Sequence, residues 1–318
     1  MDFFCKKTNE LSSEELLQIT DFFNEIMEKS ATKEFMLGLY VNNPFGFSYH
    51  SIMTDKGKVV GLSSYVPAYF WYKNQKVVFV NGTDSMIAKP YRDFFSFYTV
   101  VKNAHKYLKE NGVVLNYGYP NDKSCPVLVK GKLTKYIGKM HTYCLPYRIG
   151  GIKPKLAFLN WATIFFCRIW VFFSGLFASK KKAEFPIHKD IDTYNESRYK
   201  RFDSNYGMIN ENSNEFYYKI KEHEGMRTAF LIDVNPKSPQ NFVHAVKYII
   251  KHHSKEFDLI LYPGTLPFAV TGMIKLPRKF EPKNFNITGN ILDNTVVDSE
   301  TIYDIKNWDT NLSNYDLI

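Results

Sequence analysis

A carboxylate and two cations lie close together within residues 77–118, and such side chains could bind an anion and accept a proton. Lys89 and Arg92 suit phosphate oxygens, although each could equally be an ordinary surface cation. Asp84 could act as a base, or it could cap a turn at the end of a strand. Asn121 could hydrogen-bond a ligand or cap a helix. These residue types suggest anion binding combined with acid–base chemistry.

Two strands separated by a tight loop and a helix would position these side chains. Apolar and β-branched residues at 77–80 and 84–88 suit a strand. Pro90 ends that run because it cannot donate a backbone hydrogen bond and holds the preceding residue extended. Residues 113–115 read as a second, buried strand. We expect the two parallel strands to part after Ala88 and Tyr117.

The helix between these strands is amphipathic. Apolar residues recur every three or four positions from Phe94 to Leu108, and lysines lie off that face. Asn111 and Gly112 end the helix, since glycine tolerates the left-handed turn. The first N–H groups of such a helix are free to bind a phosphate or pyrophosphate.

At these residues the chain resembles the GNAT acyltransferase superfamily, in particular its tandem-domain acyl-CoA N-acyltransferase-like members. The resemblance covers the first half by motif and the second half by pattern only. It implies a mixed-sheet α/β fold with two tandem GNAT-like domains, of which the second is degenerate. The motifs that carry it are Thr83-Asp84-Ser85-Met86, Lys89-Pro90-Tyr91-Arg92 and Gly118-Tyr119-Pro120-Asn121.

The resemblance implies acetyl-CoA or another acyl-CoA as cofactor, and an amine as acceptor. The central strand then carries Asp84 as the catalytic base. Tyr119, where the strands should separate, is the second catalytic candidate, or a packing residue like many of the 22 tyrosines. The candidate cofactor-binding residues, led by the pyrophosphate loop, are Met86, Ile87, Arg92, Asp93, Phe94, Phe95 and Asn121.

The pyrophosphate loop departs from the family pattern. That pattern is Arg-x-x-Gly-x-Gly/Ala, whereas this chain has no glycine from Arg92 to Phe97. Glycine lets the backbone approach a phosphate without a Cβ in the way. Asp93 also places a negative charge beside the expected anion. The tyrosine that the family often uses as thiolate acid is missing, since its position falls near Val129.

Composition limits the other classes of function. The net charge of +9 and pI near 9.1 suit a polyanionic cofactor, an acidic membrane surface or a merely lysine-rich surface. No arginine-rich helix or RNA-binding aromatic motif occurs, so we expect no nucleic acid. The four cysteines lack paired or ligand spacing, and His141, His252 and His253 lack partners at ligand spacing, so we expect free thiols and no metal. No secretory signal begins the chain, which favours a cytoplasmic location.

Residues 156–178 are nearly all apolar and have lysines on both sides. Three interpretations remain open. The segment could be a buried or interdomain helix, a helix in a membrane interface with lysines at the headgroups, or a true span. Arg168 at the midpoint opposes a span because a charge is costly there. Peripheral membrane contact through 156–178 is therefore one expectation.

The pattern divides the chain into an N-terminal GNAT-like domain (1–150), a hydrophobic connector helix (151–185) and a degenerate C-terminal GNAT-like domain (186–318). In the last of these, we predict a helix at 210–224 and a strand–helix–strand unit from 229 to 262.

Three functional hypotheses follow. The first is an acyl-CoA-dependent transferase acting on an amine, such as an amino sugar or a cell-surface polymer precursor. The second is a catalytically inactive descendant that serves as a binding or scaffold module. The third is a Fem-type aminoacyltransferase, which shares the tandem fold and does not use CoA.

Overall fold

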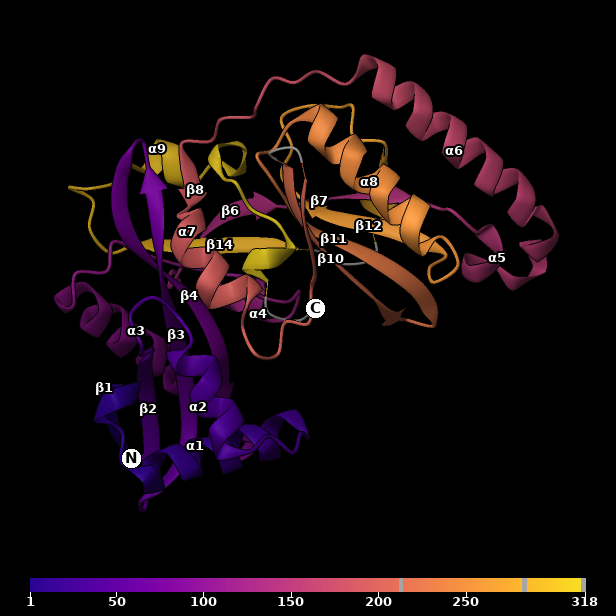
Figure 1. Cartoon of the computed structure of the whole chain (residues 1–318). Helices are drawn as coiled ribbons and strands as arrows, with labels where there is room; N and C mark the ends of the chain where they lie inside the picture. Colours follow the sequence, from indigo (N-terminus) through magenta and orange to yellow (C-terminus); the bar gives the residue numbers. More distant parts are fainter. Residues whose placement is uncertain (212–213, 282–284, 316–318) are drawn as a thin grey trace. The chain divides into compact units, whose positions relative to one another are not determined.

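The computed structural model describes residues 1–211, 214–281 and 285–315 (Figure 1). The chain forms two compact units, and neither is contiguous in sequence. Their segments are Met1–Gly138, Pro186–Asp203 and Asn286–Asn307 for unit 1, and Lys139–Phe185, Ser204–Phe285 and Trp308–Ile318 for unit 2. This division differs from the expected 1–150, 151–185 and 186–318. The reason is that β7 (His141–Leu145) belongs to the sheet of unit 2, whereas β14 (Asn286–Ile291) belongs to that of unit 1.

The sheet of unit 1 runs in the order β1-β2-β3-β4-β5-β14-β6, with β8 paired to the far end of β3. Among the strand pairs of this sheet that are assigned in the described residues, β4 and β5 alone pair in parallel. Pro67 lies in β3 between its pairing with β2, which ends at Tyr65, and its pairing with β8, which begins at Phe70. It therefore sits at a local edge, as its missing N–H requires. The strand bounds are β1 Asp2–Lys7, β2 Tyr49–Asp55, β3 Lys58–Tyr72, β4 Gln75–Ile87, β5 Leu115–Gly118, β6 Lys135–Lys139 and β8 Ile187–Lys189.

Helices pack on this sheet, and α3 does so through the apolar face that the sequence predicts. Ser12 caps the first helix in a reciprocal capping box with Glu15. Val100, Val101, Ala104 and Leu108 of the α3 helix are buried. The helices are α1 Ser13–Met27, α2 Lys33–Val41, α3 Phe94–Glu110, α4 Ser124–Lys130, α7 Ile191–Tyr194 and α9 Ser299–Ile302.

The sheet of unit 2 runs in the order β13-β7-β12-β11-β10-β9, and β11 and β12 pair in parallel. Its remaining bounds are β9 Gly207–Glu211, β10 Asn214–His223, β11 Met226–Asn235, β12 Leu259–Gly264 and β13 Ile274–Lys275. The helix expected at 210–224 is wrong, because β9 and β10 occupy the described part of that range; residues 212–213 lie outside the described residues. Phe216, Tyr218 and Ile220 share one strand face against the core, so the true period is two residues.

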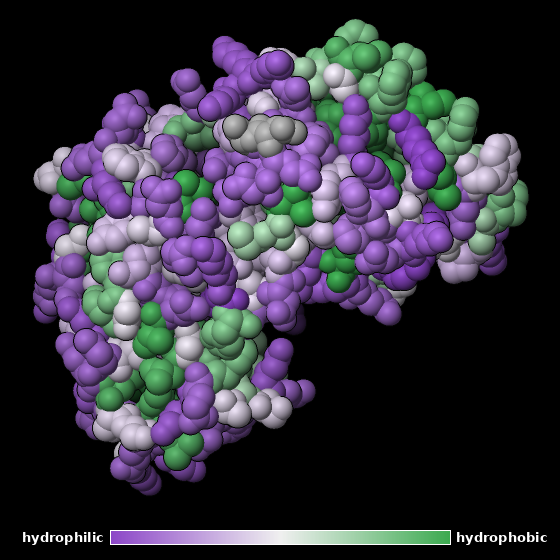
Figure 2. Space-filling view, in the orientation of Figure 1, coloured by the Kyte–Doolittle hydropathy of each residue, from purple (hydrophilic) through white to green (hydrophobic). Residues whose placement is uncertain are grey.

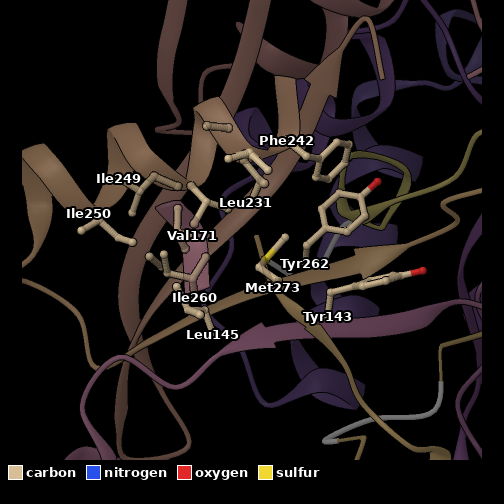
Figure 3. Packing of buried hydrophobic residues seen from close by; sticks show 14 of the residues in the cluster. Tyr143, Leu145, Val171, Leu231, Phe242, Ile249, Ile250, Ile260, Tyr262 and Met273 are labelled. Carbon is tan, nitrogen blue, oxygen red and sulfur yellow. The ribbon is translucent and has the colours of Figure 1, made fainter. Parts of the chain in front are cut away.

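The core of unit 2 lies between its sheet and two helices, α8 (Pro239–His253) and α6 (Asn160–Phe177) (Figure 3). Leu231 and Ile260 come from the central parallel strands, and Phe242 and Ile249 from α8. Cys167 and Val171 of α6 belong to this cluster, and Figure 3 labels Val171. Short helices precede α6, namely α5 (Ile149–Ile152) and the 3₁₀ turn Pro154–Leu159.

The helix expected at 156–178 is present as α6, but unit 2 buries little of it. Only Cys167 and Val171 of α6 are buried. Its aromatic residues point away from the core instead.

Candidate functional site

The parallel strands β4 and β5 separate near the middle of β4. They pair from Phe79 and Leu115 to Gly82 and Gly118, where β5 ends. A Cβ on Gly118 would lie 3.3 Å from the carbonyl oxygen of Gly82, so glycine permits the closest approach just before the strands part. Beyond Gly82, β3 is the only strand assigned to β4 within the described residues. We call this place the first fork; it opens earlier on β4 than the expected Ala88.

A β-bulge lies on β4 just past the first fork. Leu62 pairs with Met86 and Ser64 with Thr83, so Asp84 and Ser85 together oppose the single residue Ser63. Asp84 has a φ of 46°, which is the left-handed region that aspartate tolerates better than most residues. Bulges redirect a side chain and occur often beside active sites. The catalytic candidate Asp84 therefore occupies a locally specialised backbone.

Asp84 is hydrogen-bonded to a buried tyrosine that the sequence analysis missed. The Tyr40 hydroxyl donates to Asp84 Oδ2 at 3.1 Å. Tyr40 comes from α2 and is 1% exposed. Burial, with the negative charge of Asp84 as a second cause, raises the pKa of Tyr40 well above its usual value. Tyr40 is thus a neutral donor that stabilises negative charge on the carboxylate.

Further buried polar groups extend this contact into the protein. Ser64 also hydrogen-bonds the Tyr40 hydroxyl. His50 Nδ1 lies 3.0 Å from Ser64 Oγ, and His50 Nε2 lies 2.8 Å from Thr8 Oγ1. Burial lowers the pKa of His50 to about 3, so the imidazole is neutral. In the tautomer with the proton on Nδ1, His50 donates to Ser64, Ser64 to Tyr40 and Tyr40 to Asp84. The signal in the sequence was a run of polar residues inside apolar strands, at 48–51 and 63–64.

A second buried histidine lies beneath the first fork. Asn116 of β5 and Asn290 of β14 contact the two ring nitrogens of His105 at 2.9 and 3.2 Å. Burial lowers the pKa of His105 to about 4. Asn116 Oδ1 is buried and has no hydrogen-bond partner in the described part of the chain, and it would lie 3.3 Å from a Cβ on Gly82. A buried polar acceptor therefore stands beside the point where the strands part.

Tyr119 and Asn121 follow β5 directly. The ring of Tyr119 packs edge-on against buried Tyr117 at 6.0 Å between centroids. Asn121 Oδ1 accepts from the backbone N–H groups of Lys123 and Ser124, at 3.0 and 2.9 Å. The structure therefore places Tyr119 at the first fork, and it uses Asn121 to start α4.

The remaining cofactor candidates lie from the end of β4 to the start of α3. Met86 and Ile87 are buried. The Arg92 guanidinium donates to the carbonyl of Ile87, at 3.3 Å from Nε and 3.1 Å from Nη2. Arg92 is therefore bonded to the backbone at the end of β4, and its side chain remains solvent-exposed.

The N-terminus of α3 carries an anion of its own. Asp93 is the N-cap, and its carboxylate accepts from the N–H and the hydroxyl of Ser96, each at 2.8 Å. These hydrogen bonds hold the pKa of Asp93 below its usual value; the bond from the Ser96 N–H contributes most, followed by the bond from its hydroxyl. Phe94 and Phe95 are exposed, and Phe94 lies against Gly131. The rings of Phe94 and Phe95 therefore lie outside the core. The Asp93 carboxylate lies at the N-terminus of α3, where the pyrophosphate was expected.

The sheet of unit 2 contains a second fork, between β11 and β12. Their parallel pairing ends at Phe230 and Leu261. A bulge follows, and then Asp233, much as Asp84 follows the first fork. Here the C-terminal segment 308–314 lies between the strands. Asn311 bridges to Gly264 and donates to Asp233 Oδ1 at 2.5 Å.

The C-terminal segment is firmly built into the second fork. Trp308 and Leu312 are at most 1% exposed. Asp309 binds the buried ammonium of Lys237. Burial alone would lower the pKa of Lys237, but Asp309, Tyr262 and Asp233 raise it above its usual value. The second fork is therefore occupied by the chain itself, which leaves the first fork as the candidate site.

In the described residues, no group of three or more His, Cys, Asp and Glu side chains could hold a metal ion.

No protein-family model matches the chain, and no curated protein sequence matches it. Solved structures do match over most of its length. A GCN5-related N-acetyltransferase from Anabaena variabilis has a TM-score of 0.59 at 12% identity, covering 91% of this chain and 73% of that one. One from Kribbella flavida has 0.57 at 9% identity, covering 92% and 72%.

A conserved protein of unknown function and probable N-acyltransferase from Enterococcus faecalis gives a TM-score of 0.56 at 12% identity, covering 92% of this chain and 73% of that one. Identities this low establish the fold alone. The predicted fold class is confirmed: with its two mixed sheets, this chain has the fold of the GCN5-related N-acetyltransferases.

Proposed function

We propose that unit 1 transfers an acyl group from an acyl-CoA thioester to an amine, with the first fork as the donor site. The carrying observation is the combination of a parallel pair that parts at Gly82 and Gly118 with a bulged, hydrogen-bonded Asp84 directly beyond. The edge of β4 past Gly82 can pair with an extended amide chain, such as pantetheine. The occupied second fork supports the assignment to unit 1.

The transfer requires one bond to form and one to break. The amine nitrogen attacks the thioester carbonyl carbon, a C–N bond forms, and the C–S bond breaks to release the thiolate of CoA. Asp84 accepts the proton that the amine loses, as a general base. Tyr119 is the candidate donor of a proton to the thiolate, since it follows the end of β5.

Two observations favour an alternative donor. Asp93 already caps α3, and the loop from Arg92 to Phe97 has no glycine. A pyrophosphate at that helix terminus would meet a carboxylate rather than free N–H groups. A Fem-type transferase, which takes its aminoacyl group from a donor other than CoA, would not need this position.

Thermal unfolding with acetyl-CoA and longer acyl-CoAs tests the proposal. Binding to the native state should raise the melting temperature by several degrees at saturating ligand. Arg92→Ala should abolish the shift, whereas Lys58→Ala, which removes an exposed cation elsewhere in unit 1, should leave it. Release of free thiol on addition of amino sugars would then identify acceptors. If no acyl-CoA shifts the melting temperature, a CoA-dependent reaction is excluded.

A further inference from the structure

A helix that packs on a core turns its apolar face inward, whereas α6 turns its polar face toward the protein and its apolar face outward. Its small and polar residues face the protein: Asn160 Oδ1 accepts from Gly150 N at 2.7 Å, and Thr163 Oγ1 donates to Tyr147 O at 3.1 Å. Arg168 Nε donates to the Tyr147 hydroxyl at 3.1 Å. Hydrogen bonds within unit 2 therefore satisfy the polar face.

The opposite face of α6 is large, aromatic and exposed. We call it the α6 face; its members are between 50% and 76% exposed and are Trp161, Phe165, Phe166, Trp170, Phe172, Phe173, Leu176 and Phe177. Figure 2 shows hydrophobic residues gathered over the region that α6 occupies in Figure 1. Contiguous apolar surface of this kind marks an interaction site. Tryptophan and phenylalanine beside lysine are typical of helices that lie in a membrane interface.

Positive charge surrounds the α6 face. Lys153 and Lys155 precede the helix and residues 180–182 are all lysine, while no Asp or Glu occurs between Leu145 and Ala183. A pocket of about 360 Å³ lies between α6 and α8, lined by Arg168, Val171, Phe172, Lys247, Ile250 and Lys251. Three of these six residues are cations and none is acidic. Such a pocket suits the phosphate of a lipid headgroup.

We propose that unit 2 docks on an anionic phospholipid surface through the α6 face, with α6 in the plane of the interface and a headgroup phosphate between Arg168, Lys247 and Lys251. A second copy of the chain fits less well, because pairing two α6 faces would bring like charges together. The segment Pro154–Phe177 is long and apolar enough to cross a bilayer. A crossing would break the hydrogen bonds of the polar face and place Arg168 in hydrocarbon. This inference does not depend on the proposed acyl transfer.

Co-sedimentation of the full chain with phospholipid vesicles tests the surface. We expect binding to vesicles that contain phosphatidylglycerol and much weaker binding to phosphatidylcholine alone. Lys247→Gln with Lys251→Gln should lower the partition coefficient by about thirtyfold, the effect expected of two lysines at an anionic surface. Phe165→Ser with Phe166→Ser should also abolish most binding. Equal binding to both kinds of vesicle would overturn the proposal.

The matched control is Lys279→Gln with Phe280→Ser, which removes one exposed lysine and one exposed phenylalanine outside α6 and α8. It should bind as the unaltered chain does, and all variants should keep the same melting temperature. If the control loses as much binding as the α6 variants, the α6 face is not the docking surface. Self-association that the α6 variants abolish, without vesicle binding, would assign the face to a second copy.

Depth measurement separates docking from a span. Fluorescence of Trp161 and Trp170 should shift to shorter wavelength on vesicles, and lipids brominated near the headgroup should quench it more than lipids brominated at the chain end. Stronger quenching from the chain end would show that α6 enters the bilayer centre, and would overturn the interfacial placement.

Discussion

The Tyr40 hydroxyl donates a hydrogen bond to Asp84 at 3.1 Å, and it joins the bulged end of β4 to the buried side chains of Ser64 and His50. Asp84 thus has a supporting network that a carboxylate capping a turn would not need. Buried polar groups that satisfy one another fix the orientation of the group at the end of the chain.

Tyr40→Phe should lower kcat for acyl transfer by about tenfold to a hundredfold, because a hydrogen bond to a charged group contributes about 1.5–3 kcal/mol. KM for the acyl donor should change little, since Tyr40 lies within the core. Steady-state kinetics measure both constants. Tyr136→Phe, at an exposed tyrosine of unit 1, is the matched control. An unchanged kcat in Tyr40→Phe would contradict the role of Asp84 as the general base.

Asp93→Asn should tighten CoA binding about threefold to tenfold. Asparagine keeps the cap of α3, while the negative charge beside the pyrophosphate disappears. Isothermal titration calorimetry with CoA measures the change. Asp192→Asn removes an exposed charge of unit 1 away from this helix and should have no effect. The same affinity in Asp93→Asn and the unaltered chain would mean that CoA binds away from the start of α3.

Acid should destabilise the protein through its buried histidines. The pKa values of His50 and His105 are lowered to about 3 and about 4 in the folded state. Both histidines take up protons on unfolding below the ordinary pKa of 6.5, so stability falls as the pH drops from about 6.5 toward 4. We expect a loss of about 2 kcal/mol per histidine by about pH 5.

Urea unfolding at neutral and acidic pH measures this loss. His105→Gln should reduce the pH dependence of the unfolding free energy by the share of one histidine, whatever it does to stability at neutral pH. His50→Gln offers an independent test in a different part of unit 1. If both variants keep the pH dependence of the unaltered chain, His50 and His105 are not the groups that destabilise the protein in acid.

Asp309→Ala should cost about 3–5 kcal/mol of stability, because it leaves the buried Lys237 ammonium without its main partner. Changing Lys237→Met together with Asp309→Leu should cost less, since no buried charge remains. Urea unfolding compares the two. The exposed pair of Lys200 and Glu196 is the control, and breaking it should cost less than about 1 kcal/mol. If Asp309→Ala lowers the free energy of unfolding by less than about 1 kcal/mol, as for the exposed pair, the ion pair of Asp309 with Lys237 does not stabilise the C-terminal segment in the second fork.

Much of the fold was readable from local pattern. The helix at Phe94, its termination at Gly112 and the strand that follows are set by hydrophobic period, proline and glycine, which act over a few residues. The prediction of a helix at 210–224 was wrong because the aromatic residues in that stretch fit both a helical period of 3.6 residues and a strand period of two. Antiparallel pairing with β11 stabilises the strand β10 in place of a helix.

Local sequence pattern was enough to identify Asp84, Arg92 and Asn121 as candidate side chains and to predict an apolar helix after residue 156. The three-dimensional packing established that Tyr40 and His50 support Asp84, that Asp93 caps the start of α3, and that 308–314 enters the second fork. It also decided that α6 turns its aromatic face outward. Each of these depends on contacts between residues far apart in the chain, and a local pattern carries no information on which distant group will satisfy a buried polar atom.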